Sequence, residues 1–157
     1  MKRLLTAMFV VGTIAGLAIA VTAWAKPKDE PDHKGGKTIT VIEHATTDAT
    51  TDTGASGDSV GDVLTFANEV FDGKDARKVG TDQGYCVRVV RGTSYECNFT
   101  TLLAGGNIAV EGPFYDAEDS VLAITGGTGR YRKARGTMDL HAREGGTEFA
   151  FVFHITG

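Results

Sequence analysis

Apolar and polar residues alternate with a period of two along most of the chain after residue 37, which is typical of β-strands with one buried face. In one such run, Leu64, Phe66 and Val70 share a strand face with the polar Asn68. The alternation and the turn residues between the runs predict eight strands, at residues 38–43, 63–71, 85–90, 95–102, 107–115, 120–125, 137–142 and 147–155.

The connections between these strands are short and rich in turn-forming residues. They include Asp72-Gly73, Arg91-Gly92, Gly105-Gly106 and Gly145-Gly146. Residues 75–78 could form at most one helical turn, and the Thr-, Asp-, Gly- and Ser-rich residues 46–61 predict a long mobile loop. We therefore expect an all-β fold, an eight-stranded antiparallel β-barrel, because closure removes exposed strand edges. A β-sandwich fits the same pattern.

The N-terminal residues follow a different pattern. Lys2 and Arg3 precede an uncharged apolar run, residues 4–20, and Ala23-Trp24-Ala25 follows it. This order predicts a signal peptide, residues 1–25, cleaved after Ala25, and a secreted, extracellular protein. The alternative is an uncleaved anchor, since the run is nearly long enough to span a bilayer. Residues 26–36 have no aliphatic side chain and predict a flexible leader, so the folded domain is expected at 37–157.

Charge excludes two classes of partner. The chain has 16 Lys and Arg against 20 Asp and Glu, a net charge of −4, which becomes −6 when Lys2 and Arg3 are removed. Nucleic-acid binding and basic membrane attachment both need clustered positive charge, which the acidic domain lacks. We expect no nucleic-acid partner, and no membrane association after signal cleavage.

Cys86 and Cys97 lie on consecutive predicted strands. A two-residue turn at Arg91-Gly92 places them opposite each other, and in an exported protein this favours a disulfide. That simple register makes them a hydrogen-bonded pair, which is less suitable for a bridge, so a bulge or a longer loop is expected. Two buried free thiols are the alternative. No metal site is predicted, since the histidines at 33, 44, 141 and 154 show no ligand spacing.

Several blocks, in order along the chain, carry a resemblance to a known family. They are residues 61–71, 78–80, 84–87, 110–114, 118–120, 122–129 and 136–140. In these blocks the sequence resembles the allene oxide cyclase family, within the wider group of barrels that includes dirigent proteins. The Gly-Gly-Thr-Gly loop and its continuation, residues 126–136, are closer to the dirigent form.

The resemblance implies a cofactor-free cyclase that isomerises a fatty-acid epoxide inside an apolar barrel. It places Glu43 where the family steadies positive charge, and Asn68 where the family holds a water at the epoxide oxygen. These two are the candidate catalytic residues. The candidate ligand-binding residues are Leu64, Phe66, Cys86, Arg88, Tyr95, Val110 and Phe114.

Two departures from the family bear on this interpretation. Phe114 replaces a tyrosine, which removes a hydroxyl group. Arg88 stands where the family is aliphatic, and inside a barrel it would need a partner. Glu43 could be that partner, which would make it a counter-ion instead of a catalyst.

Three functional hypotheses follow. The first is a barrel that binds, and cyclises or isomerises, a small apolar or amphipathic ligand. The second is a dirigent-like auxiliary that steers phenolic radicals, with Arg130, Arg132 and Arg135 as candidate phenolate contacts. The third is a non-catalytic extracellular barrel packed shut. The expected partners are a small apolar or phenolic ligand and, by family analogy, further copies of the chain.

Overall fold

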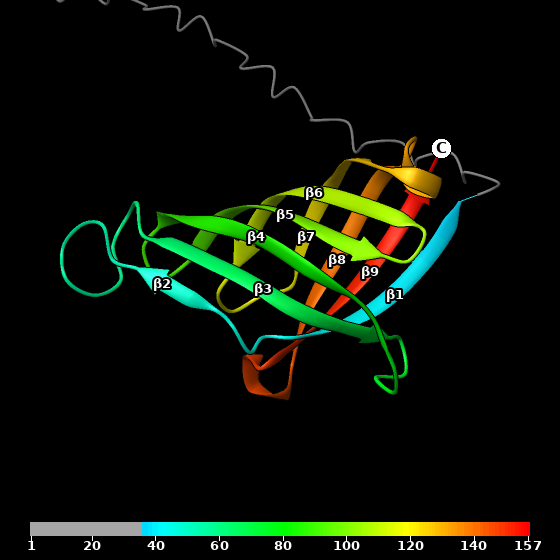
Figure 1. Ribbon diagram of the computed structural model, residues 1–157. Coiled ribbons are helices and arrows are strands. Elements are labelled where there is room, and N and C mark those ends of the chain that lie inside the picture. Colours follow the sequence, from blue (N-terminus) through cyan, green and yellow to red (C-terminus); the bar gives the residue numbers. More distant parts are fainter. Residues whose placement is uncertain (1–35) are drawn as a thin grey trace, which may run out of the picture. The chain divides into compact units, whose positions relative to one another are not determined.

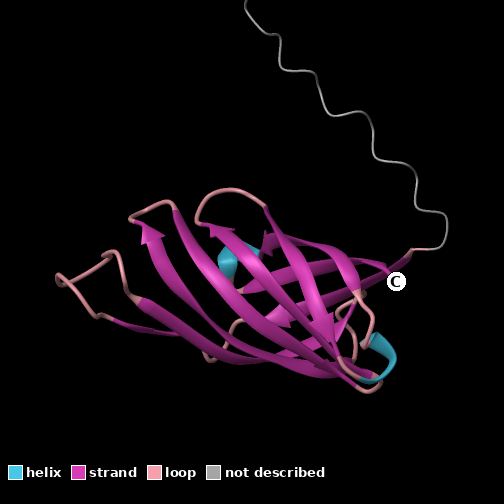
Figure 2. Cartoon of the chain, turned by 90° about the horizontal axis from the view of Figure 1, so that it is seen from above, coloured by secondary structure: helices cyan, strands magenta, loops and turns pink. Residues whose placement is uncertain are grey.

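Strands account for nearly all of the regular secondary structure in the computed structural model, which describes residues 36–157 (Figures 1 and 2). In chain order the elements are β1 (Lys37–His44), β2 (Ala49–Thr51), β3 (Val63–Asp72), β4 (Lys78–Val90), β5 (Ser94–Leu103), β6 (Gly106–Tyr115), β7 (Ser120–Gly127), the 3-10 turn η1 (Gly129–Tyr131), β8 (Arg135–Arg143), the 3-10 turn η2 (Glu144–Gly146) and β9 (Glu148–Thr156). The expected signal peptide and all but the last residue of the expected leader lie outside the described residues. Within residues 36–157, no helix has the length and apolarity that crossing a bilayer requires.

The sheet closes on itself. Its strand order is β1-β9-β8-β7-β6-β5-β4-β3-β2, and β1 pairs with β3 as well as with β9. All of these pairings are antiparallel. The eight long strands therefore form a closed barrel, as predicted, and the alternative of a β-sandwich is wrong.

One edge of β3 is shared by β1 and the short strand β2. β1 pairs with its second half, where Glu43 lies opposite Val70, and β2 pairs with its first half, where Thr50 lies opposite Leu64. In Figure 1, β1 and β2 lie one after the other along β3. Residues 45–48 form a gap between the two strands, and the candidate site lies at this gap. The loop expected at 46–61 thus contains a strand.

β4 begins seven residues before the predicted strand, because two of its glycines resemble turn residues in sequence. Both glycines lie against β5. A Cβ on Gly80 would come within 2.0 Å of the Leu102 carbonyl oxygen, and one on Gly84 within 2.2 Å of Phe99 Cβ. Glycine is therefore required here for close strand approach, not for a turn.

The disulfide between Cys86 and Cys97 is present, which confirms the predicted bridge. The two residues are direct partners across β4 and β5, and the register shifts between Arg88 and Val90. The Cα atoms lie 4.0 Å apart, the short spacing of a non-hydrogen-bonded pair. The bulge near Val89 accounts for this spacing, so the simple two-residue turn was wrong and the expected irregularity is found.

Candidate functional site

The gap between β1 and β2 is bridged by the side chain of Asn68, which is fully buried on β3. Its Oδ1 accepts hydrogen bonds from the backbone N–H of Thr46 (3.1 Å) and of Thr47 (2.9 Å), and from Thr47 Oγ1 (2.8 Å). Thr47 Oγ1 in turn accepts from the backbone N–H of Ala67 (2.8 Å). The amide thus replaces the ladder bonds that are missing where the edge strand is interrupted.

The other end of the same amide holds two carboxylates. Asn68 Nδ2 donates to Glu43 Oε1 (2.6 Å) and to Asp48 Oδ1 (2.7 Å). An amide nitrogen has two hydrogens, so its donors are fully used. The sequence placed Asn68 where the related family holds a water, whereas here its contacts position Glu43 and Asp48.

A third carboxyl group lies behind this pair. Asp82 on β4 is fully buried and faces Asn68 on β3 and Thr101 on β5. Among residues 36–157, no donor group reaches either oxygen of the Asp82 carboxylate. Its ionisable neighbour is the Glu43 carboxyl, and two carboxyls this close together in a buried site are most stable when one of them carries a proton.

Burial raises the pKa of Glu43 to about 7, although the hydrogen bond from Asn68 opposes the shift. Burial and the neighbouring Glu43 charge raise the pKa of Asp82 to about 9. Close to neutral pH Asp82 therefore keeps its proton, and Glu43 is the carboxyl of the pair that titrates.

Glu43 and Asp48 form the acidic part of the wall of a partly open cavity of about 100 Å³, called the internal cavity below. The rest of the wall is apolar and consists of Leu64, Phe66, Cys86, Cys97, Phe99, Phe114, Leu140, Phe149 and Phe151. Phe66 packs edge-on against Phe99, with ring centroids 5.6 Å apart. The space is smaller than the roughly 150 Å³ apolar cavity that holds one benzene, so a single small ring is the largest ligand it suits.

A second hollow, of about 500 Å³, lies on the other side of the cavity wall. Phe114, Leu140 and Phe149 line both spaces. Phe114 and Phe149 are half-buried and pack edge to face, with centroids 5.7 Å apart. These two rings therefore border both the internal cavity and the outer hollow.

The candidate ligand-binding residues fall into two groups. Leu64, Phe66, Cys86 and Phe114 line the cavity. Val110 is packed in the core, and Arg88 and Tyr95 border a separate polar hollow.

The sequence did not identify Asp48, which lies in an apparent loop, or Asp82, which lies in a polar run. The alternating phenylalanines at 149, 151 and 153 have a spacing that by itself favours barrel filling.

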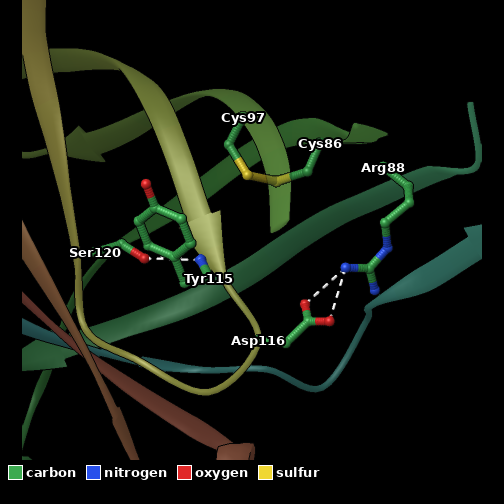
Figure 3. The surroundings of a disulfide bond; sticks show 6 residues. All are labelled: Cys86, Arg88, Cys97, Tyr115, Asp116 and Ser120. Carbon is green, nitrogen blue, oxygen red and sulfur yellow. Dashed lines mark hydrogen bonds and ion pairs between the residues drawn. A yellow bond between two sulfur atoms is a disulfide. The ribbon is translucent and has the colours of Figure 1, made fainter. Parts of the chain in front are cut away.

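Arg88 does not pair with Glu43, which corrects the expectation that Glu43 could be its counter-ion. The Arg88 side chain is 8% exposed; its Nε lies 2.7 Å from Asp58 Oδ1, and its Nη1 donates to both Asp116 oxygens at 2.8 Å. Figure 3 shows the guanidinium directed at Asp116, beside the disulfide. The Tyr95 ring lies 3.6 Å from the guanidinium carbon. Arg88 is thus neutralised apart from the cavity, and Glu43 is free of it.

The three arginines proposed as phenolate contacts, Arg130, Arg132 and Arg135, are exposed, and none of them lines the internal cavity. Their placement fits a solvated surface.

One group of described residues has donor atoms close enough to hold a cation. His44, Asp75 and Glu148 bring their ligand atoms within 4.8 Å of one another. His44 Nε2 lies 2.8 Å from Asp75 Oδ1, and Arg143 lies 3.6 Å from Glu148 Oε2. Ion pairing and hydrogen bonding account for this cluster without a metal. The fold brings together groups that are 31 and 73 positions from one another in sequence, so no local spacing could reveal them.

Together, these features define a class: a closed eight-stranded barrel with an aromatic internal cavity and a buried acidic group at its wall. Residues 40–157 match the allene oxide cyclase family. The chain belongs to this family.

Several solved structures of other barrel proteins are similar to this chain. A pyocyanin demethylase is 27% identical, with a TM-score of 0.68, and the match covers 76% of this chain and all of that one. The pterocarpan synthase dirigent protein PsPTS1 is 19% identical (TM-score 0.59, covering 79% and 98%). An exo-specific intermolecular Diels-Alderase, AbnU, is 14% identical (TM-score 0.61, covering 78% and 98%). The last two similarities establish the shared fold alone.

Proposed function

We propose that this chain binds a small ring-bearing molecule inside the barrel and catalyses an isomerisation or cyclisation of it by proton transfer, without a cofactor. Export from the cell is part of the proposal and rests on the pattern of residues 1–25. The observation that carries the chemical part is Glu43, a buried carboxyl at the wall of an aromatic cavity.

Glu43 has the properties of a general acid or base. Its pKa of about 7 means that both protonation states are populated at neutral pH, which is the condition for efficient proton transfer. Asn68 holds the carboxyl from one side, and the cavity lies on the other. A bound ligand would therefore exchange a proton with Glu43, while Asn68 keeps the carboxyl in place.

The aromatic walls supply binding and exclude water. Burial of a ring against phenylalanine side chains is favourable by about 25 cal/mol per Å² of apolar surface removed from water. Phe114 and Phe149 border both the cavity and the outer hollow, so their rotation would admit a ligand. The proposal thus makes these two rings the entrance.

The relatives support small-molecule chemistry in this barrel. A structure 27% identical to the chain is named a demethylase that acts on pyocyanin, and the family is named for a cyclase. Because one fold carries several reactions, the reaction assigned to this chain rests on Glu43 and on the cavity.

Two matched pairs of variants test the proposal. Leu64 points into the cavity and Thr65 points outward on the same strand, so Leu64→Trp should abolish binding of small aromatic ligands, whereas Thr65→Trp should not. Binding is measured by thermal shift and native mass spectrometry against monocyclic aromatic compounds. With a ligand that is turned over, Glu43→Gln should reduce kcat by about 10²–10⁴-fold. Glu111→Gln, at an exposed position on β6, is the control.

Equal binding by Leu64→Trp and the wild type would reject the internal site. Unchanged turnover in Glu43→Gln would remove Glu43 from the chemistry. Native mass spectrometry of protein collected outside its producing cell tests the export proposal. The expected chain begins at Lys26, and a chain that retains residues 1–25 would refute cleavage.

A further inference from the structure

The ionisable groups at the internal cavity are all acidic. Glu43 and Asp48 belong to its wall, and Asp82 lies directly behind Glu43. Within the part of the chain that the structure describes, no Lys, Arg or His contributes to this wall. An anionic ligand would therefore meet only carboxyl groups.

Arg88 is a buried basic residue close in sequence to the cavity, but it does not change the charge of the cavity wall. Arg88 lies two residues after the cavity residue Cys86, but Asp58 and Asp116 already neutralise it, and Tyr95 covers it. Its positive charge is thus engaged in the separate polar hollow. The cavity remains acidic.

The rest of the wall favours the same sign of ligand. Five phenylalanine rings contribute to it, and the face of an aromatic ring carries a negative quadrupole that attracts cations. This attraction is stronger in a desolvated site than at an exposed surface. Acidic groups and aromatic faces therefore act together.

We infer that the cavity prefers a small planar ring that carries a positive charge, and that binding of such a ring releases a proton from Glu43. This inference rests on the proposed function, since it names the ligand class of the same site. A fatty-acid carboxylate or a phenolate is the opposite class.

Proton release follows from the surroundings of Glu43. The titratable groups that face it are Asp48 from the gap, Asp82 from β4 and His44, its neighbour in β1, while β9 presents the uncharged Phe149. A cation beside Glu43 stabilises the ionised carboxylate and lowers its pKa from about 7. The affinity for a cationic ring should accordingly rise as the pH increases from 5 to 8, whereas the affinity for a neutral ring should not.

Three monocyclic probes of similar size separate the possibilities: N-methylpyridinium, toluene and benzoate. Isothermal titration calorimetry at pH 7, in two buffers with different ionisation enthalpies, measures both affinity and protons released. We expect N-methylpyridinium to bind at least about tenfold more tightly than toluene, with release of a fraction of a proton. Benzoate should bind most weakly.

Glu43→Gln should reduce the preference for the cation to less than about threefold and abolish proton release, while toluene still binds. Glu111→Gln should behave like the wild type.

The outcomes separate the inference from the proposed function. If toluene binds and N-methylpyridinium binds no more tightly, the charge preference is wrong and the internal site stands. Tight cation binding without proton release would refute the release of a proton from Glu43. If none of the three probes binds, both the inference and the proposed function fail.

Discussion

The two ends of the barrel interior are built on the same alternation of residues, yet they differ in how they are filled. At the packed end, Leu122, Met138 and Phe153 pair across neighbouring strands and are at most 1% exposed. At the cavity end, Phe114 and Phe149 are half-buried beside a space of about 100 Å³. The inward-facing side chains of β6 and β9 extend from the packed end of the barrel to the cavity end.

The boundary between the two ends is polar. Glu43, Asn68, Asp82 and Thr101 occupy inward positions where the alternation calls for apolar side chains, and all four are buried. Buried polar groups without partners are expensive, so a core that contains them gives up stability relative to an apolar one. The difference between the ends thus suggests that the packed end supplies the stability that the cavity end gives up.

The largest expected effect is at the packed end. Phe153→Ala removes a ring that is 0% exposed, and we expect it to lower the free energy of unfolding by about 3–5 kcal/mol. Phe149→Ala, four residues earlier on the same strand, removes a half-buried ring next to existing space and should cause a loss of about 1–2 kcal/mol. Urea denaturation measures both. Equal losses would mean that the two ends are packed alike.

The second effect concerns the wall of the cavity. Cys86 and Cys97 line the cavity and close a loop with a sequence separation of 11. Constraint of such a loop in the unfolded chain is worth roughly 3 kcal/mol, so Cys86→Ala/Cys97→Ala should be destabilised by about that amount. Reductant should lower the Tm of the wild type towards that of the double variant. A reductant-dependent Tm in the double variant would show that the effect is not due to the bridge.

The sequence predicted the barrel more completely than the site. Alternation and turn residues are local, so they predicted eight strands in their order, and they failed mainly at β4, where Gly80 and Gly84 permit close strand approach. Glu43 and Asn68 were candidates through family resemblance. Asp82 was missed because its neighbours Thr81 and Gln83 are also polar. Only the pairing of β4 with β3 and β5 turns Asp82 into the barrel.

The smallest expected effect is a change in how folding stability depends on pH, and it tests the buried carboxyls of the polar boundary. In the unfolded chain, Asp82 and Glu43 ionise near their ordinary pKa values of 3.8 and 4.5, whereas burial raises both in the folded protein, to about 9 and about 7. Between these limits the folded state binds more protons, so stability is fully present below the unfolded values and is lost as the pH rises through the folded ones.

Asp82→Asn should make this pH dependence shallower, because the amide does not ionise. Between pH 5 and pH 8.5 we expect the wild type to lose at least about 1.4 kcal/mol more than the variant, which is the equivalent of one pKa unit. Urea midpoints at the two pH values give the difference. Asp119→Asn alters a carboxylate that is 65% exposed and should follow the wild type. If Asp82→Asn kept the slope of the wild type, Asp82 would be ionised at neutral pH and would carry no buried proton.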